Sequence, residues 1–252
     1  MAKKTLLEIV QDILNDIDGD EVSSITDTVE ASQIAQIVKT TYENMSTHRN
    51  WPFQKSLIQL EAASDTSRPT HIRIPDACKE IFDISYNVSG DGVTRVQYLP
   101  ITYLEPDAFL QTTNGRDTDQ TNIAQVTDFG GGIFFIRNDV APTYWTSFDD
   151  EYVVFDSFDS DVDDTIQNSK TQVMAYVEEA MTLTDDSYPP IPNEAFPTLI
   201  AEAKSKAAFS LNQVVDSKAE KEARKGRQWL SQKVFKTSGG IKYPRRGRRS
   251  AK

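Results

Sequence analysis

The stretch Phe196-Pro-Thr-Leu-Ile-Ala-Glu-Ala-Lys-Ser-Lys-Ala-Ala-Phe-Ser-Leu-Asn-Gln-Val214 decides the fold of this 252-residue chain. Pro197 stands where a proline can open a helix, since the first helical position needs no backbone donor. Apolar residues then recur at helical spacing and predict one buried face: Leu199, Ile200, Ala203, Ala207, Leu211 and Val214. Beyond Val215 this stripe disappears, because Lys218 to Gln228 contains only alanines and Gly226 among charged and polar residues.

If this helix continues to about Lys233, as a long C-terminal helix would, it is roughly 55 Å long at about 1.5 Å per residue. Its first half would pack on the rest of the protein. Its second half would project into solvent, and would leave four apolar side chains for another surface: Trp229, Leu230, Val234 and Phe235.

Two helices are predicted near the N-terminus. Thr5-Leu-Leu-Glu8 is a capping box, in which Thr5 and Glu8 satisfy each other's backbone N–H groups. Leu6, Val10, Ile13, Leu14 and Ile17 follow at helical spacing. A second helix starts at Asp27 or Thr28 and ends near Asn50, and its apolar stripe is Ala31, Ile34, Val38, Tyr42 and Met45.

Between the helical parts, short apolar runs beside Gly, Pro and Asp predict β-strands. They cover residues 57–60, 71–74, 80–88, 93–99, 133–136, 143–148 and 152–155, with 173–177 read as a strand or a short helix. Ser89-Gly-Asp-Gly92 predicts a hairpin turn. The expected fold class is α+β, a helical bundle with a β-rich insertion: residues 1–52 and 188–235 form a discontinuous helical domain, 53–187 the insertion and 236–252 a basic C-terminal extension.

Charge is segregated along the chain. Residues 218–252 hold 13 Lys or Arg against two acids, a net of +11, whereas all other residues hold 14 basic and 36 acidic side chains, a net of −22. The last twelve residues, 241–252, carry six cations and no acid, with too few apolar residues to fold alone, so we expect a partner to order them. A protein with an acidic body and a basic end typically uses that end to bind a partner molecule.

No chemical signature of an enzyme is present. His48 and His71 lie outside any metal-binding spacing, and Cys78, the single cysteine, fits a reducing compartment. The run Asp159 to Asp164 departs from a calcium loop, because Asp164 replaces the turn glycine and Lys170 the bidentate Glu, which leaves weak cation binding or a solvated loop open. We expect no catalytic residues, no metal, no cofactor and no membrane-spanning segment, and an acid directly after Leu6 and Leu7 argues against a signal peptide.

Several stretches, taken in their order, resemble the head-to-tail adaptor (connector) proteins of short-tailed, podovirus-type bacteriophages. They cover most of the chain, and their specificity lies in their order. They are Leu6-Leu-Glu-Ile-Val-Gln-Asp-Ile-Leu14 with Asp18-Gly-Asp20, Val38-Lys-Thr-Thr-Tyr42 with Arg49-Asn-Trp-Pro-Phe53, Ile136-Arg-Asn-Asp139 through Pro142-Thr-Tyr-Trp-Thr-Ser-Phe-Asp-Asp-Glu-Tyr152, and Phe196-Pro-Thr-Leu-Ile-Ala-Glu-Ala-Lys204 with Lys218-Ala-Glu220.

This resemblance implies a virion structural protein of the neck or tail, assembled in the host cytoplasm. Such adaptors form a twelve-fold ring, a dodecamer, under the portal protein, continue the DNA channel used in genome ejection, and carry a downstream nozzle or tail-hub protein. The C-terminal extension grips the portal, which in this chain would be the helix after Val215 and the tail after Lys236. The expected portal-binding residues are Trp229, Phe235, Ile241, Lys242, Tyr243, Arg245, Arg246, Arg248 and Arg249.

Two other functional classes stay open. The basic end would also suit a monomeric protein that binds nucleic acid, because cations attract phosphate. An enzyme that acts on the host envelope is the third class.

Overall fold

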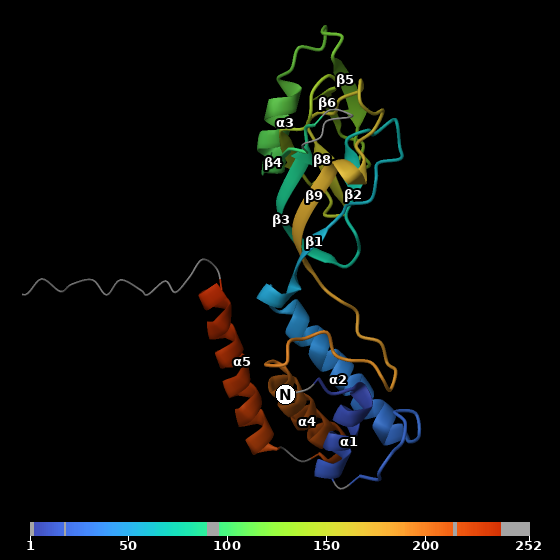
Figure 1. Ribbon diagram of the computed structural model, residues 1–252, viewed down its shortest axis with the longest axis vertical. Coiled ribbons are helices and arrows are strands. Elements are labelled where there is room, and N and C mark those ends of the chain that lie inside the picture. Colours follow the sequence, from blue (N-terminus) through green and yellow to red (C-terminus); the bar gives the residue numbers. More distant parts are fainter. Residues whose placement is uncertain (1–2, 18, 90–95, 214–215, 238–252) are drawn as a thin grey trace, which may run out of the picture. The chain divides into compact units, whose positions relative to one another are not determined.

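The computed structural model describes residues 3–17, 19–89, 96–213 and 216–237, with backbone alone for residues 212 and 233–237. The chain divides into two compact units, 1–54 with 178–252, and 55–177. We call them the helical unit and the β-rich unit (Figure 1). The sequence-based division placed the insertion at 53–187.

The helical unit contains α1 (Leu6–Asp16), α2 (Val29–Thr47), the 3-10 turn η1 (Pro52–Gln54), α4 (Phe196–Asn212) and α5 (Ser217–Thr237). The predicted capping box of α1 is confirmed: the Glu8 N–H donates to the Thr5 hydroxyl, and the Thr5 N–H donates to the Glu8 carboxylate. Thr28 caps α2. Apolar side chains of α1, α2 and α4 interlock in one core that includes Leu6, Ile13, Ile34, Val38, Tyr42, Leu199 and Ala203.

The predicted continuous C-terminal helix is wrong. α4 ends at Asn212, where Gln213 adopts a left-handed conformation with φ of 54°, and a separate helix, α5, packs against α4 (Figure 1). The second half therefore does not project. Leu230, predicted to await another surface, is buried in the core of the helical unit. Helical periodicity indicates which residues are helical. It does not indicate where one helix ends and the next begins, and Gln213 is not a residue that usually breaks a helix.

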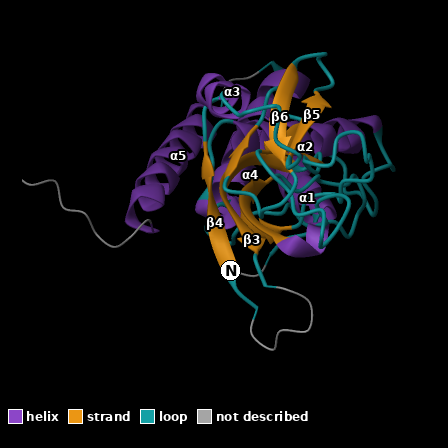
Figure 2. Ribbon diagram, turned by 90° about the horizontal axis from the view of Figure 1, so that it is seen from above, coloured by secondary structure: helices purple, strands orange, loops and turns teal. Residues whose placement is uncertain are grey.

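The β-rich unit is built on a curled seven-stranded sheet in the order β1-β9-β3-β4-β7-β8-β2, beside a separate β5-β6 hairpin (Figure 2). The sheet is antiparallel except where β4 lies parallel to β7. Its strands are β1 (Lys55–Ile58), β2 (His71–Arg73), β3 (Cys78–Asn87), β4 (Tyr98–Tyr103), β7 (Tyr144–Thr146), β8 (Tyr152–Phe155) and β9 (Thr171–Val177); the hairpin strands are β5 (Ile123–Thr127) and β6 (Ile133–Arg137). The segment read as strand or helix is thus a strand, β9. Residues 90–95 of the predicted hairpin turn lie outside the described residues.

The sequence missed a helix in this unit, α3 (Pro106–Asn114), which begins with a proline and buries Phe109 and Thr113. A short 3-10 turn, η2 (Asn168–Lys170), precedes β9. Aromatic rings fill the core between α3 and the hairpin, where Phe109, Phe134 and Phe148 lie with their centroids 5.9 to 6.0 Å apart.

The predicted fold class is therefore wrong as a whole. The chain is a mixed α/β protein with a large curled sheet, not a helical bundle that carries a small β-rich insertion. The physical reason is that strands β2 and β7 are only three residues long and that pairs such as β1–β9 and β2–β8 join distant segments. Local patterns reveal such strands one at a time and do not show that they belong to one sheet.

Candidate functional site

The described part of the basic end is α5. Between Ser217 and Thr237 this helix carries seven Lys or Arg and two Glu, a net charge of +5. Its side chains are mostly exposed, so α5 presents a cationic surface on a chain whose net charge is −11. The way α5 is attached to the helical unit decides what this surface can do.

α5 packs on α4 through a face of small residues. Ala219, Ala223 and Leu230 are buried, and Gly226 is half-buried on the same face, at helical spacings of four, three and four. Gly226 lies so near α4 that an added Cβ would stand 2.2 Å from the Thr198 hydroxyl oxygen and 3.0 Å from its Cβ. The glycine therefore permits an approach that any side chain would prevent.

Replacing Gly226 with Ala should separate α5 from α4, although in an exposed helix the same change adds about 1 kcal/mol of helix stability. The steric overlap with Thr198 outweighs that gain, because neither backbone can move without opening the interface. We expect faster amide hydrogen exchange throughout α5 and unchanged exchange in α1. A second change, Thr198→Ala, should restore part of the protection; slower exchange in Gly226→Ala alone would contradict this account.

A buried carboxylate forms the polar part of the same interface. The Glu202 side chain on α4 is only 8% exposed, and its two oxygens accept from Arg227 of α5, with Nε to Oε2 at 2.8 Å and Nη2 bonded to Oε1. Lys206 lies 3.3 Å from the same Oε1 and donates to the Thr41 hydroxyl at 3.2 Å. Arg49 donates to Ser231 at 2.6 Å beside them. These residues border a cavity of about 490 Å³ between the end of α2, α4 and α5.

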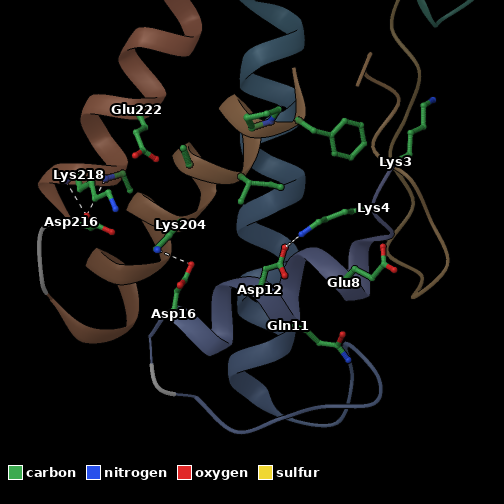
Figure 3. Close-up of a pocket in the computed structure, with 15 residues that line it drawn as sticks. Lys3, Lys4, Glu8, Gln11, Asp12, Asp16, Lys204, Asp216, Lys218 and Glu222 are labelled. Carbon is green, nitrogen blue, oxygen red and sulfur yellow. Dashed lines mark hydrogen bonds and ion pairs between the residues drawn. The ribbon is translucent and has the colours of Figure 1, made fainter. Parts of the chain in front are cut away.

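A larger groove of about 730 Å³ lies between α1, α4 and the start of α5 (Figure 3). Two ion pairs lie on its rim: Lys4 bonds Asp12, and the Lys204 ammonium lies 2.6 Å from the Asp16 carboxylate. Apolar side chains are also part of its lining: Phe196, Pro197, Ile200, Ala201 and Ala219.

Asp216, on the rim of this groove, fixes the start of α5. Its Oδ1 accepts from the backbone N–H groups of Lys218 and Ala219, each at 3.0 Å. These hydrogen bonds, that of Ala219 above all, hold the pKa of Asp216 below its ordinary value. The groove therefore combines ion pairs with apolar side chains.

The residues tested for chemistry in the sequence lie apart. His48 is exposed after α2, His71 is buried in β2, and Cys78 is half-buried at the start of β3. Within the part of the chain that the structure describes, no group of three or more His, Cys, Asp or Glu could hold a metal ion, and the acidic run from Asp159 is included in that search.

His71 is nevertheless sensitive to its surroundings. Its Nε2 lies 3.1 Å from the Asp128 carboxylate, its ring packs against Phe129 and Phe134, and its Nδ1 is buried without a hydrogen-bond partner. Burial lowers the pKa of His71 below its ordinary value of 6.5, and it outweighs the opposing effect of Asp128. The neutral ring is therefore the form that the β-rich unit stabilises.

We expect the β-rich unit to lose stability as the pH falls below about 6.5, the pKa of an unfolded histidine. The unfolded chain takes up a proton there, and the folded His71 does so only at lower pH. Thermal unfolding measured from pH 7.5 to 5.5 should show this loss in the wild type and in His48→Asn. A His71→Asn variant should show a flat profile over the same range; an equal slope in that variant would contradict the assignment to His71.

The predicted portal-binding residues have different positions in the structure. Trp229 lies on α5 and is 50% exposed, while Phe235 falls within the bounds of α5 and its side chain is not described. The remaining seven lie outside the described residues: Ile241, Lys242, Tyr243, Arg245, Arg246, Arg248 and Arg249. Trp229 is thus the one member of this predicted set whose side chain the structure describes, and the portal-binding site stays a prediction.

What sequence reasoning missed is the interface beneath α5. Alanines and one glycine among charges were read as the loss of an apolar face, yet Ala219, Ala223, Gly226 and Leu230 recur with a helical period. That period was the available signal for a close helix contact. The partner residues Thr198 and Glu202 gave no such signal, because a polar residue on a helix is usually exposed.

No protein-family model matches this chain, and a search of curated proteins finds no significant match. None of the helices in the described ranges combines the length and the apolar character that a membrane span requires.

Proposed function

We propose that this chain is a head-to-tail adaptor of a short-tailed bacteriophage, a virion structural protein that forms a ring under the portal. The observation that carries the proposal is the order of the resembling stretches, from Leu6–Leu14 through Pro142–Tyr152 to Phe196–Lys204. In this role the chain would extend the DNA channel, contact copies of itself in a twelve-fold ring, and carry the next tail protein.

The charge pattern supports the same role. The residues outside 218–252 have a net charge of −22, so a channel wall made from them would not hold DNA during ejection. The 218–252 segment, at +11, would supply charge-assisted contacts to carboxylates on a portal. The groove and the cavity described above, lined by paired charges and apolar side chains, suit a protein that works through polypeptide contacts.

The experiment is to mix the purified chain with portal rings of the same phage and to examine the mixture by size-exclusion chromatography and electron microscopy. We expect a stable complex with one copy of this chain per portal subunit, visible as an added ring layer. A chain that never co-elutes with portal rings would overturn the proposal.

The alternative, a nucleic-acid-binding protein, is favoured by one observation, the six cations without an acid in residues 241–252. It predicts complexes with DNA in the absence of portal that weaken steeply as salt rises. Binding to short duplex DNA, measured across a series of salt concentrations, separates the two functions.

A further inference from the structure

The interface between α4 and α5 differs from the core beneath it. Among the side chains described on α5, Ala219, Ala223 and Leu230 are buried and Gly226 is half-buried, whereas α1 and α2 contribute larger aliphatic side chains such as Leu6, Ile13, Ile34 and Val38 to the core. The polar part of the described contact centres on the Arg227–Glu202 ion pair. Within residues 217–232 this contact buries little apolar area, which lowers the cost of separating α5 from α4.

We call the arrangement in which α5 packs on α4 of its own chain the closed form. In the closed form, the backbone next to this interface is strained. Gln213 has φ of 54°, a conformation that a residue with a Cβ adopts at a cost of about 1–2 kcal/mol. The residues before Gln213 are helical, and helix resumes at Ser217. Straightening the chain at Gln213 would relieve the strain, and it would also move α5 away from its own α4.

Charge decides where a released α5 would bind. α5 carries a net charge of +5, and the residues outside 218–252 carry −22. Two copies of this chain repel each other as whole molecules, because each has a net charge of −11. A second copy nevertheless presents the same α4 surface, on which Thr198 would lie opposite Gly226 and Glu202 opposite Arg227.

We propose that α5 is exchanged between copies of this chain, so that α5 of one copy packs on α4 of another. The exchanged contact repeats every interaction of the closed form, which is why exchange of an identical element is a low-cost route to assembly. The proposal does not depend on the adaptor function. In an adaptor ring it would link each subunit to the next.

A disulfide across the α4–α5 contact tests the exchange. In a Cys78→Ser background, Thr198→Cys and Gly226→Cys place two Cβ atoms about 3.0 Å apart, about half an ångström below the usual range for a disulfide, and the first change removes the Thr198 hydroxyl that a side chain at 226 would meet. We expect oxidation to give mainly monomers with an internal crosslink in dilute protein. Covalent dimers and longer chains should increase over about a hundredfold rise in concentration.

The matched control carries Thr198→Cys alone in the same background. It has no thiol on α5, so it cannot report the exchanged contact. It should give few covalent dimers at any concentration, and their amount measures the background of disulfides between position-198 thiols of separate molecules. Covalent dimers in the double-cysteine protein that do not exceed this background would overturn the proposal.

The conformation of Gln213 provides a second, independent test in the same double-cysteine protein. Gln213→Gly removes the cost of positive φ and should lower the ratio of exchanged to closed molecules by about fivefold or more. Gln213→Val, whose branched side chain resists positive φ, should raise that ratio by a similar factor. Equal ratios in the two variants, or the opposite order, would also overturn the proposal.

Discussion

Replacing Arg116 with Met is expected to destabilise the β-rich unit by about 3–5 kcal/mol, because it leaves a buried carboxylate without its partner. Arg116 follows α3 and reaches into the unit, where its Nη2 lies 2.7 Å from Asp156 Oδ2; the two side chains are 13% and 5% exposed. Its Nη1 also donates to the carbonyl oxygens of Phe135 and Asp156 at 3.1 and 2.6 Å. One guanidinium thus connects α3, β6 and the end of β8.

The other oxygen of Asp156 is already occupied. Its Oδ1 accepts from the backbone N–H groups of Thr143 and Tyr144 at 2.9 and 2.8 Å, and so fixes the start of β7. In the Met variant the carboxylate keeps these two bonds and loses its counter-ion. Hydrogen exchange of β7 and β8 amides, followed in urea, measures the loss.

The control for this prediction is Arg137→Met. Arg137 lies 3.3 Å from Asp139, with side chains 42% and 40% exposed, and an exposed pair of this kind contributes at most about 1 kcal/mol. If Arg116→Met and Arg137→Met destabilised the β-rich unit equally, burial of the Arg116–Asp156 pair would make no extra contribution to its stability.

Deleting residues 237–252 is expected to abolish joining to portal-bearing heads and to leave both compact units folded. The deleted segment holds Ile241 and Tyr243 as apolar anchors and six of the cations of the chain. Among the described residues, the core side chains of the two units lie between Leu6 and Leu230. The melting temperature should therefore stay within measurement error of the full chain.

A charge variant separates the roles of charge and apolar contact in the tail. Four substitutions to Ser, at Arg245, Arg246, Arg248 and Arg249, should weaken docking in a way that depends on salt, because exposed ion pairs are screened. The control makes the same change of charge on the body, with Ser at Lys39, Arg73, Arg137 and Lys170. If the chain that lacks residues 237–252 still joined portal-bearing heads normally, the portal contact would lie in the body. The prediction that the tail binds the portal would then be refuted.

The strongest local signals predicted the helical parts of the structure correctly. The capping box at Thr5 and the apolar stripe from Leu6 to Ile17 predicted α1 correctly. Both signals are local, because the start of a helix and its buried face depend on residues that are close together in sequence. The break at Gln213 could not be predicted from the local pattern, because Gln is not a residue that usually ends a helix. Only the structure shows that Gly226 and Arg227 of α5 contact α4.

The sheet and the candidate surfaces depended on contacts that no local pattern contains. β4 lies parallel to β7 with α3 between them in sequence, and β1 pairs with β9 across the whole β-rich unit. Glu202 has the sequence environment of an exposed helical acid, and the structure places it, buried, at the contact with α5. For the tail, composition predicts a binding segment, and the identity of the partner remains a proposal.

The pairing of β1 with β9 has a consequence for loop closure. Lys55 and Tyr176 are opposite each other, so the chain enters and leaves the β-rich unit about 5 Å apart, one strand spacing. For the helical unit, the 123 residues from 55 to 177 then act as a short hairpin loop instead of a long flexible one. Closing a loop of about four residues costs about 3 kcal/mol less than closing one of that length, at about 0.6 kcal/mol per doubling. If the β-rich unit folds first, α2 and α4 therefore meet with most of the entropic cost of their separation in sequence already removed.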